Sequence, residues 1–218
     1  HNQNVLLSDA FSSSEAIGIG TSLMTKDQTI DVAKFALGPN CKVFSEDLKE
    51  VQPGTGESGM VAVKGFLPIG YYKDQEKTDK TFIVIDGIRY SIPGDWVRVE
   101  DDGSLTLLGR GSNCINTAGE KVYPEEVEEA LKFHEAVADA LVVGVKDEKW
   151  GQSITAVVQP HDGCVIDELA LREFSRKHLA AYKLPKKILI KDDLNRAPNG
   201  KADYKSIQEY AEQQLGIN

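Results

Sequence analysis

The spacing of apolar residues changes near residue 111, and this change constrains the fold more than any other feature of the chain. Before it, short apolar runs such as 81–87 and 95–110 indicate strands and hairpins, with the Asp102-Gly103 pair as a turn signal in the second run. The segments that connect them are rich in glycine and proline. After it, apolar residues recur at helical spacing in some segments and form continuous strand-like runs in others. We therefore predict a mainly β part over 1–111 and an α+β part over 112–218.

The second part is predicted to combine helices and strands. Its first helix begins at Pro124, where a proline followed by glutamates is typical of a helix start. The patterns predict a small three-stranded α+β domain. The predicted helices cover 124–134, 167–180 and 203–215, and the predicted strands cover 138–145, 154–160 and 186–192.

Composition narrows the classes of partner and location. The 218 residues include 25 Lys and Arg against 34 Asp and Glu, for a net charge of −9, and such a surface repels phosphate backbones. We therefore expect no nucleic-acid partner. No run of 18 apolar residues occurs, so no membrane span is expected. The three cysteines lack a C-x-x-C spacing, which argues against a disulfide framework or a zinc site and predicts a reducing, cytoplasmic location.

Three short motifs suit nucleotide chemistry, although each also has a plainer interpretation. The hydroxyl-rich segment that ends at Glu15 suits magnesium and phosphate oxygens, or forms a polar turn. Arg110 follows a glycine and can fork onto a ribose or phosphate oxygen, or is a surface arginine. Lys201 lies on a tight turn from which it can reach a phosphate. The G-x-G-x-x-G match at 54–59 precedes a strand pattern, so we interpret it as a turn.

The order and spacing of these motifs resemble a known family. Together they are similar to the adenylate-forming superfamily of acyl-CoA synthetases, luciferases and peptide-synthetase adenylation domains. The amino-acid sequences of these motifs are most similar to those of bacterial, actinobacterial-type fatty-acid–CoA ligases. The segments that carry the resemblance are FSSSEAIG (11–18), GYYKDQEKT (70–78), GDWVRVEDDGSLTLLGRGSNCINTAGEKVYPEEVEEAL (94–131) and PNGKADY (198–204).

The resemblance implies an architecture and a reaction. Residues 1–111 would be the C-terminal part of a large adenylation domain, with the end of a sheet region followed by a β-barrel. Residues 112–218 would be a small mobile domain that carries the catalytic lysine. The reaction would be ATP-dependent acid–thiol ligation: a carboxylate attacks the α-phosphate of MgATP, and coenzyme A then displaces AMP. The implied substrates are ATP, CoA and a fatty acid or similar carboxylic acid, with Mg²⁺ as cofactor.

The family's nucleotide-binding roles carry over to five positions. Phe11 would stack on adenine, and Ser14 would hold phosphate. Glu15 would be catalytic and would bind the Mg²⁺. Asp95 would accept from the ribose hydroxyls, and Arg110 would also hold the ribose. The first of these positions departs from the family, because Phe11 and the following serine replace the usual Tyr-Gly.

Three further roles belong to the second part of the chain. Lys201 would bridge the α-phosphate and the attacking carboxylate during adenylation. Gly119 would lie by the channel for the pantetheine arm of CoA, where a side chain would obstruct it. Ser112 would be the hinge about which the small domain rotates, although the family often has Asp or Lys at this position.

One family motif is absent. No Ser/Thr/Gly-rich phosphate loop ending in Pro-Lys-Gly occurs in the sequence, so we expect the chain to be a piece of a larger ligase, inactive alone. An apolar face exposed by the missing part would favour a homo-oligomer. Two alternatives stay open: an adenylation domain that loads a carrier-protein phosphopantetheine, and a non-catalytic nucleotide-binding module. Retention of Glu15, Asp95, Arg110 and Lys201 together argues against the second alternative.

Overall fold

The computed structural model describes residues 6–25 and 34–217. The chain divides into two compact units, His1–Gly111 and Ser112–Asn218, which we call unit 1 and unit 2. None of the helices in the described residues combines the length and the apolar character that crossing a membrane requires.

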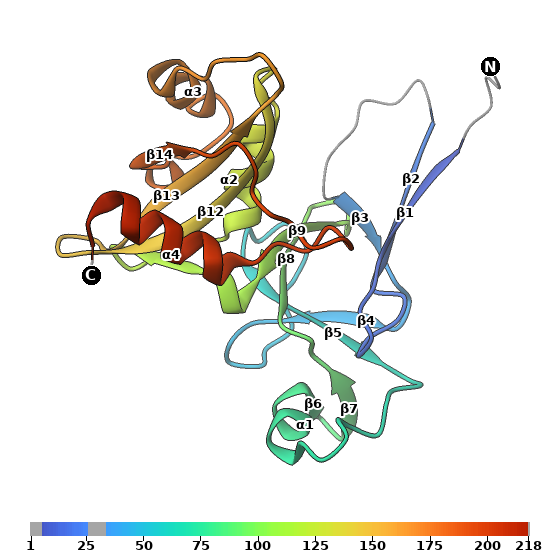
Figure 1. Ribbon diagram of the computed structural model, residues 1–218. Helices are drawn as coiled ribbons and strands as arrows, with labels where there is room; N and C mark the ends of the chain where they lie inside the picture. Colours follow the sequence, from blue (N-terminus) through green and yellow to red (C-terminus); the bar gives the residue numbers. More distant parts are fainter. Residues whose placement is uncertain (1–5, 26–33, 218) are drawn as a thin grey trace. The chain divides into compact units, whose positions relative to one another are not determined.

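The described part of unit 1 is an antiparallel nine-stranded sheet with one short helix (Figure 1). The strands run in the order β1-β2-β3-β9-β8-β5-β7-β6, and β4 pairs with β5. Their bounds are β1 Leu7–Phe11, β2 Gly20–Met24, β3 Lys34–Leu37, β4 Cys41–Phe44, β5 Ser58–Lys64, β6 Phe82–Ile85, β7 Ile88–Ser91, β8 Asp95–Val99 and β9 Leu105–Arg110, with the helix α1 at Gln75–Thr81 between β5 and β6.

The hairpin predicted over 95–110 is confirmed. It consists of β8 and β9, which pair from Val99 opposite Leu105 to Asp95 opposite Arg110. The side chain of Asp102 accepts from the backbone N–H of Ser104, which fixes the turn between the two strands. This hairpin places two candidate site residues directly across from each other at its open end.

The predicted β-barrel is not confirmed, because the pairings among the described strands of unit 1 form no closed circuit. The sheet branches at β5 instead of closing. The first half of β5 pairs with β8, and its second half, at Val63 and Lys64, pairs with β7. The strands therefore diverge from β5. The 54–59 segment leads into β5 and no helix follows it, which agrees with the turn interpretation.

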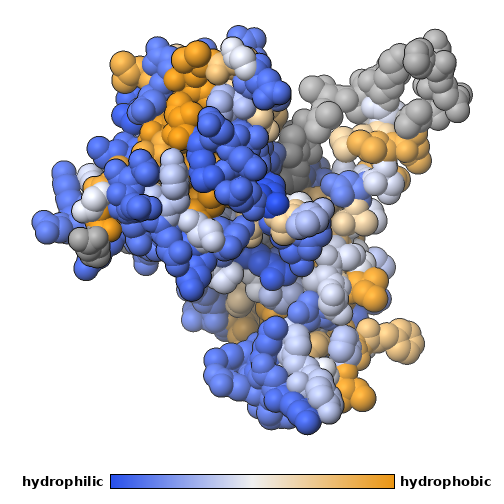
Figure 2. Space-filling view, in the orientation of Figure 1, coloured by the Kyte–Doolittle hydropathy of each residue, from blue (hydrophilic) through white to orange (hydrophobic). Residues whose placement is uncertain are grey.

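Several large apolar side chains of unit 1 lie at the surface. Figure 2 shows apolar residues on the surface of this unit, and the loop after β5 carries the exposed residues Phe66, Ile69 and Tyr72. Such a group on a protein surface is typical of a contact region. Self-association through it stays a prediction.

Unit 2 is a sheet with helices on both faces (Figure 1). The prediction of three strands is wrong: the described residues form five, in the order β11-β10-β13-β12, with β14 beside β13. The two missed strands have three residues each, too few to show an alternating pattern. The bounds are β10 Ile115–Thr117, β11 Glu120–Val122, α2 Pro124–Lys132, β12 Val137–Asp147, β13 Gly151–Pro160, α3 Glu168–Ser175, β14 Lys187–Ile190 and α4 Tyr204–Leu215.

The long strand β12 separates two apolar layers in unit 2. Its residues Ala140 and Val142 join the layer that α2 and α3 cover. Leu141 and Val143, which alternate with them along the strand, join the layer that α4 covers. Alternation along the strand therefore assigns the helices to opposite faces of the sheet. The strand lies at the edge of the sheet, with β13 as its only neighbour among the described strands.

The helix α3 offers a matched pair of leucines for testing this packing. Leu171 is fully buried beneath the sheet, whereas Leu169 is 72% exposed on the same helix. Leu171→Ala is expected to lower the free energy of unfolding of unit 2 by about 3 kcal/mol, because it leaves a cavity. Leu169→Ala is expected to change it by less than about 0.5 kcal/mol. Urea unfolding followed by circular dichroism measures both, and equal effects would contradict the packing described here.

Candidate functional site

The first group of candidate residues lies at the open end of the β8–β9 hairpin in unit 1. Asp95 begins β8 and Arg110 ends β9, and the two are register partners. The Nε of Arg110 donates to Oδ1 of Asp95 over 3.2 Å. The Asp95 side chain is only 9% exposed, whereas that of Arg110 is 55% exposed. Burial raises the pKa of Asp95, and the charge of Arg110 offsets only part of that effect.

Glu15 joins this group from the loop after β1. Its Oε1 accepts a hydrogen bond of 2.5 Å from the hydroxyl of Tyr71. That bond is the main reason why the pKa of Glu15 lies below its ordinary value, and the charge of Arg110 lowers it further. Glu15 in turn raises the pKa of Asp95. The fold therefore brings Glu15, Tyr71, Asp95 and Arg110 into one electrostatic cluster, which we call the carboxylate cluster.

The loop that carries Glu15 is also a polar turn. The hydroxyl of Ser12 accepts from the N–H of Gly18, and that of Ser13 accepts from the N–H of Ala16. Ser14 follows Ser13 directly and is exposed. The two interpretations of this motif are thus compatible, since turn bonds of its neighbours hold the loop that presents Ser14 and Glu15.

Phe11, at the end of β1, lies in the apolar core of unit 1. It is 9% exposed, and its ring centroid lies 5.4 Å from that of Phe35. Stacking of Phe11 on adenine stays a prediction.

Tyr71 is the residue of the carboxylate cluster that sequence reasoning missed. The signal was the Gly-Tyr-Tyr of the 70–78 segment, which carried the family resemblance but received no role. Two contacts hold Tyr71 in position. Its backbone N–H donates to the hydroxyl of Thr78 over 2.9 Å, and the Nζ of Lys77 lies 4.0 Å from its ring centroid. Only the fold shows that it contacts Glu15, 56 residues away in the chain.

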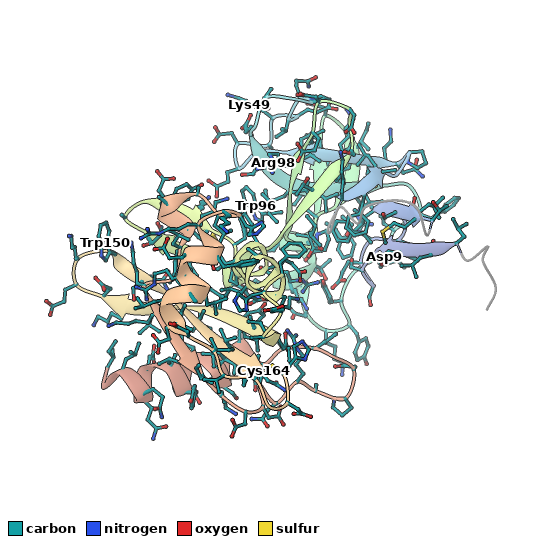
Figure 3. The ribbon with its side chains drawn as sticks, turned by 90° about the horizontal axis from the view of Figure 1, so that it is seen from above. Asp9, Lys49, Trp96, Arg98, Trp150 and Cys164 are labelled. Atoms are coloured by element: carbon teal, nitrogen blue, oxygen red, sulfur yellow. The ribbon has the colours of Figure 1, made fainter. Side chains whose placement is uncertain are left out.

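Unit 1 ends at a close approach between backbone and ring. A Cβ on Gly111 would lie 2.6 Å from Nε1 of Trp96, which is labelled in Figure 3, so glycine alone fits there without a shift of the indole. Ser112 is the next residue, exposed within the short 3₁₀ turn Gly111–Asn113, and it begins unit 2. A hinge at Ser112 stays a prediction.

Gly119 lies in the tight turn between β10 and β11. Its φ is +87°, a conformation that favours glycine, and no atom lies within 4 Å of the position that a Cβ would occupy. The local reason for glycine is therefore the backbone conformation. The role of Gly119 beside a pantetheine channel stays a prediction.

Lys201 lies on a turn with many internal hydrogen bonds. The N–H of Ala197 donates to the carbonyl of Lys201, the N–H of Gly200 donates back to Ala197, and the N–H of Lys201 donates to Oδ1 of Asn199. Arg196 adds a bond from Nη1 to the carbonyl of Gly200 over 3.2 Å. We call residues 196–201 the lysine loop. It presents an exposed lysine on an ordered backbone.

Side chains on both sides of Lys201 connect the lysine loop to the sheet and to α2. Before the lysine, Arg196 forms a bidentate ion pair with Asp139 of β12, at 2.5 and 3.0 Å. After it, the hydroxyl of Tyr204, at the start of α4, donates to Oε2 of Glu128 on α2 over 3.1 Å. The other oxygen of Glu128 accepts from the N–H of Val142 on β12 over 2.9 Å. Sequence reasoning assigned no role to these four side chains, and their separations of 57 and 76 residues explain why.

Glu128 has an unusual electrostatic environment. It is 4% exposed, and burial is the main cause that raises its pKa from an ordinary 4.5 to about 7. The nearby Glu125 raises it further, whereas the bonds from Val142 and Tyr204 partly oppose the shift. Burial also raises the pKa of Tyr204, and the charge of Glu128 adds to that effect. The pair is therefore a neutral phenol beside a carboxyl group that titrates near neutrality.

Comparison with known proteins agrees with this geometry. Residues 126–201 match the AMP-binding enzyme C-terminal domain family. Over 210 residues, 96% of the chain, the sequence is 46% identical to a medium/long-chain-fatty-acid–CoA/3-oxocholest-4-en-26-oate–CoA ligase of Mycobacterium tuberculosis, of which the match covers 38%. A 3-oxocholest-4-en-26-oate–CoA ligase of Rhodococcus rhodochrous is 45% identical over 97% of the chain and 38% of the relative. The chain belongs to the adenylate-forming enzymes.

A solved structure supports membership of the adenylate-forming enzymes. The ATP-bound crystal structure of MatB from Rhodopseudomonas palustris matches with a TM-score of 0.73 and 30% identity, over 88% of this chain and 38% of that one. The predicted family resemblance is confirmed. The chain spans 38% of the length of the two curated relatives named above.

The adenylate-forming family implies Mg²⁺, and the carboxylate cluster is compatible with it. The described residues contain no group of three or more His, Cys, Asp or Glu side chains that could enclose a metal. Mg²⁺ in phosphate chemistry needs only one or two carboxylates, because substrate phosphates and water complete its shell. Glu15 is partly exposed, and its lowered pKa keeps it ionised, so it fits such a ligand.

Glu128 leads to a prediction about stability and pH. Its folded-state pKa lies above the unfolded value of 4.5, so folding favours the protonated form. The stability of unit 2 is expected to fall by up to about 3 kcal/mol as the pH rises from about 4.5 to about 7. Glu128→Gln is expected to abolish that fall, because glutamine is neutral throughout. Urea unfolding of the chain across this pH range measures it.

The control for this prediction is Glu129→Gln on the same helix. Glu129 is half-exposed and forms an ion pair with Lys132, so the substitution makes the same change of charge away from the buried site. It is expected to keep the wild-type pH dependence. The assignment to Glu128 is wrong if both variants behave alike.

Proposed function

We propose that this chain is part of an ATP-dependent fatty-acid–CoA ligase, which forms an acyl-adenylate and then an acyl-CoA thioester. The observation that carries the proposal is the 46% identity to the mycobacterial medium/long-chain-fatty-acid–CoA ligase over 96% of the chain. The carboxylate cluster and the lysine loop support it, because each supplies groups that this chemistry needs. Consumption of ATP and CoA fits a cytoplasmic location, as do the three free cysteines among the described residues.

Unit 1 holds the nucleotide in this proposal. Arg110 is exposed at the rim of the carboxylate cluster, where it can donate to a ribose or phosphate oxygen, while Asp95 orients its guanidinium. Glu15 would hold the Mg²⁺, which would neutralise phosphate charge, and Tyr71 orients the Glu15 carboxylate. Ser14 adds a hydroxyl to the phosphates, and Phe11 contributes apolar surface below the adenine.

Unit 2 supplies the mobile charge. During adenylation the carboxylate of the acid attacks the α-phosphorus, pyrophosphate leaves, and negative charge accumulates on the phosphoryl oxygens. Lys201 donates to that charge from the ordered lysine loop, which lowers the barrier without a large reorganisation of the backbone. A rotation about Ser112 then presents Gly119 and its turn to the pantetheine arm, and the CoA thiol displaces AMP.

The ligase proposal is tested by acid-dependent release of pyrophosphate from MgATP. The product of the complete reading frame that contains this chain is expected to release pyrophosphate only when a medium- or long-chain fatty acid is present. The 218-residue chain alone is expected to release none, because its sequence has no Pro-Lys-Gly phosphate loop. Absence of release from the complete product with every acid would refute the ligase. Supplying CoA or a phosphopantetheinylated carrier as acceptor separates thioester formation on CoA from carrier loading.

Lys201→Ala in the complete product tests the role of the lysine. The adenylation rate is expected to fall by about 100-fold or more, since one donor to the developing charge is lost. Thioester formation from a supplied acyl-adenylate is expected to persist. Lys205→Ala, which removes another exposed lysine, from the first turn of α4, is the matched control and is expected to leave both half-reactions unchanged. Equal loss of both half-reactions in Lys201→Ala would refute the assigned role.

A further inference from the structure

We propose that Glu128 and Tyr204 are positioning residues for adenylation, which hold the lysine loop in place from the α2 side of the edge strand. The inference rests on the proposed function, because it assigns the loop a role in one half-reaction. Glu128 and Tyr204 would act on the reaction only through the lysine loop, without touching substrate. Glu128 belongs to α2, which covers one face of the sheet, whereas Tyr204 begins α4, which covers the other face.

The connection runs around the edge of the sheet at β12. Glu128 accepts one bond from the edge strand at Val142 and another from Tyr204. The sheet therefore does not separate the two helices at this point: one hydrogen bond connects the first residue of α4 to Glu128 of α2, and a second connects Glu128 to β12. Because Tyr204 follows Lys201 by three residues, displacement of Tyr204 would displace the C-terminal end of the lysine loop.

The two attachments of the lysine loop differ chemically. Arg196 and Asp139 form an ion pair in which the pKa of Asp139 lies below its ordinary value, because bonds from Arg196 and a backbone N–H outweigh the effect of burial. That attachment keeps its charge throughout the neutral range. Of these two attachments, only the one through Glu128 changes its charge near neutrality.

The protonation state of Glu128 changes the strength of its bonds. As a carboxylate it accepts from both Val142 and Tyr204, and such charge-assisted bonds are about twice as strong as neutral ones. As a neutral acid it must use one oxygen as a donor. The charged groups that act on it are Glu125 and Lys132 of α2 and Arg196 of the lysine loop. We therefore expect the lysine loop to be held more tightly above neutral pH.

Tyr204→Phe in the complete product is the first test. It removes only the hydroxyl that Glu128 accepts from, and the adenylation rate is expected to fall by about tenfold, the effect of one charge-assisted hydrogen bond. Thioester formation from supplied acyl-adenylate is expected to stay within about twofold of wild type. Tyr210→Phe is the matched control: it removes a hydroxyl from the same helix, bonded to the carbonyl of Ile190, and is expected to leave both rates unchanged.

Glu128→Gln supplies a second, independent test through the pH profile. Wild-type adenylation is expected to rise between about pH 6 and 8, and the ratio of variant to wild-type rate is expected to fall over the same range, because glutamine does not titrate. A purely structural role would lower both half-reactions equally at every pH and leave that ratio flat. Should Tyr204→Phe fail to fold, this ratio still decides the question.

The outcomes separate this inference from the proposed function. A wild-type product that releases no pyrophosphate with any acid refutes the ligase. An active wild type in which Tyr204→Phe matches Tyr210→Phe, or in which both half-reactions fall together, refutes only the positioning role. Loss confined to adenylation, together with a pH-dependent Glu128→Gln ratio, supports it.

Discussion

The long antiparallel pairing of β12 with β13 is the interaction on which unit 2 depends. It runs from Val137 opposite Pro160 to Asp147 opposite Gly151, and its alternating side chains supply both apolar layers. Because β12 lies at the edge of the sheet, its outer side is open to side chains from elsewhere. The N–H of Val142 uses that side to bind Glu128, and the side chain of Asp139, on the same strand, binds the lysine loop. One pairing thus determines the core and the attachment of the lysine.

In unit 1 a hairpin has the corresponding role. The register of β8 with β9 places Asp95 opposite Arg110, so a buried acid and an exposed guanidinium meet without any loop rearrangement. Burial disfavours the charge on Asp95, whereas the Tyr71 hydroxyl favours the charge on Glu15. Two carboxyl groups of one cluster therefore have pKa values shifted in opposite directions. Because its pKa is lowered, Glu15 is the carboxyl group of the two that is better suited to bind a cation.

Sequence patterns predicted the elements whose signal is local. The helices α2 and α4 begin and end within two residues of the predicted bounds, and the β8–β9 hairpin has its predicted turn. The prediction for α3 extended to 180, but the helix ends at Ser175, whose hydroxyl bonds to the carbonyl of Leu171. The seven-residue α1, which has no apolar stripe, was not predicted, nor were the three-residue strands β10 and β11. The prediction of three strands was wrong because β10 and β11 are too short to show a pattern, and the barrel was not confirmed because strand partners are chosen by contacts between distant segments.

The sequence by itself determined the family, the amphipathic helices and the tight turn at Lys201, because spacing and turn chemistry are properties of neighbouring residues. It also identified Glu15, Asp95, Arg110 and Lys201 as a chemically coherent set. Only the tertiary structure decided that Tyr71 binds Glu15 and that Glu128 binds Tyr204, since these pairs are 56 and 76 residues apart. It also decided how each acid titrates. A carboxyl group has the same composition wherever it occurs, but its pKa depends on the burial and the partners that only the folded chain provides.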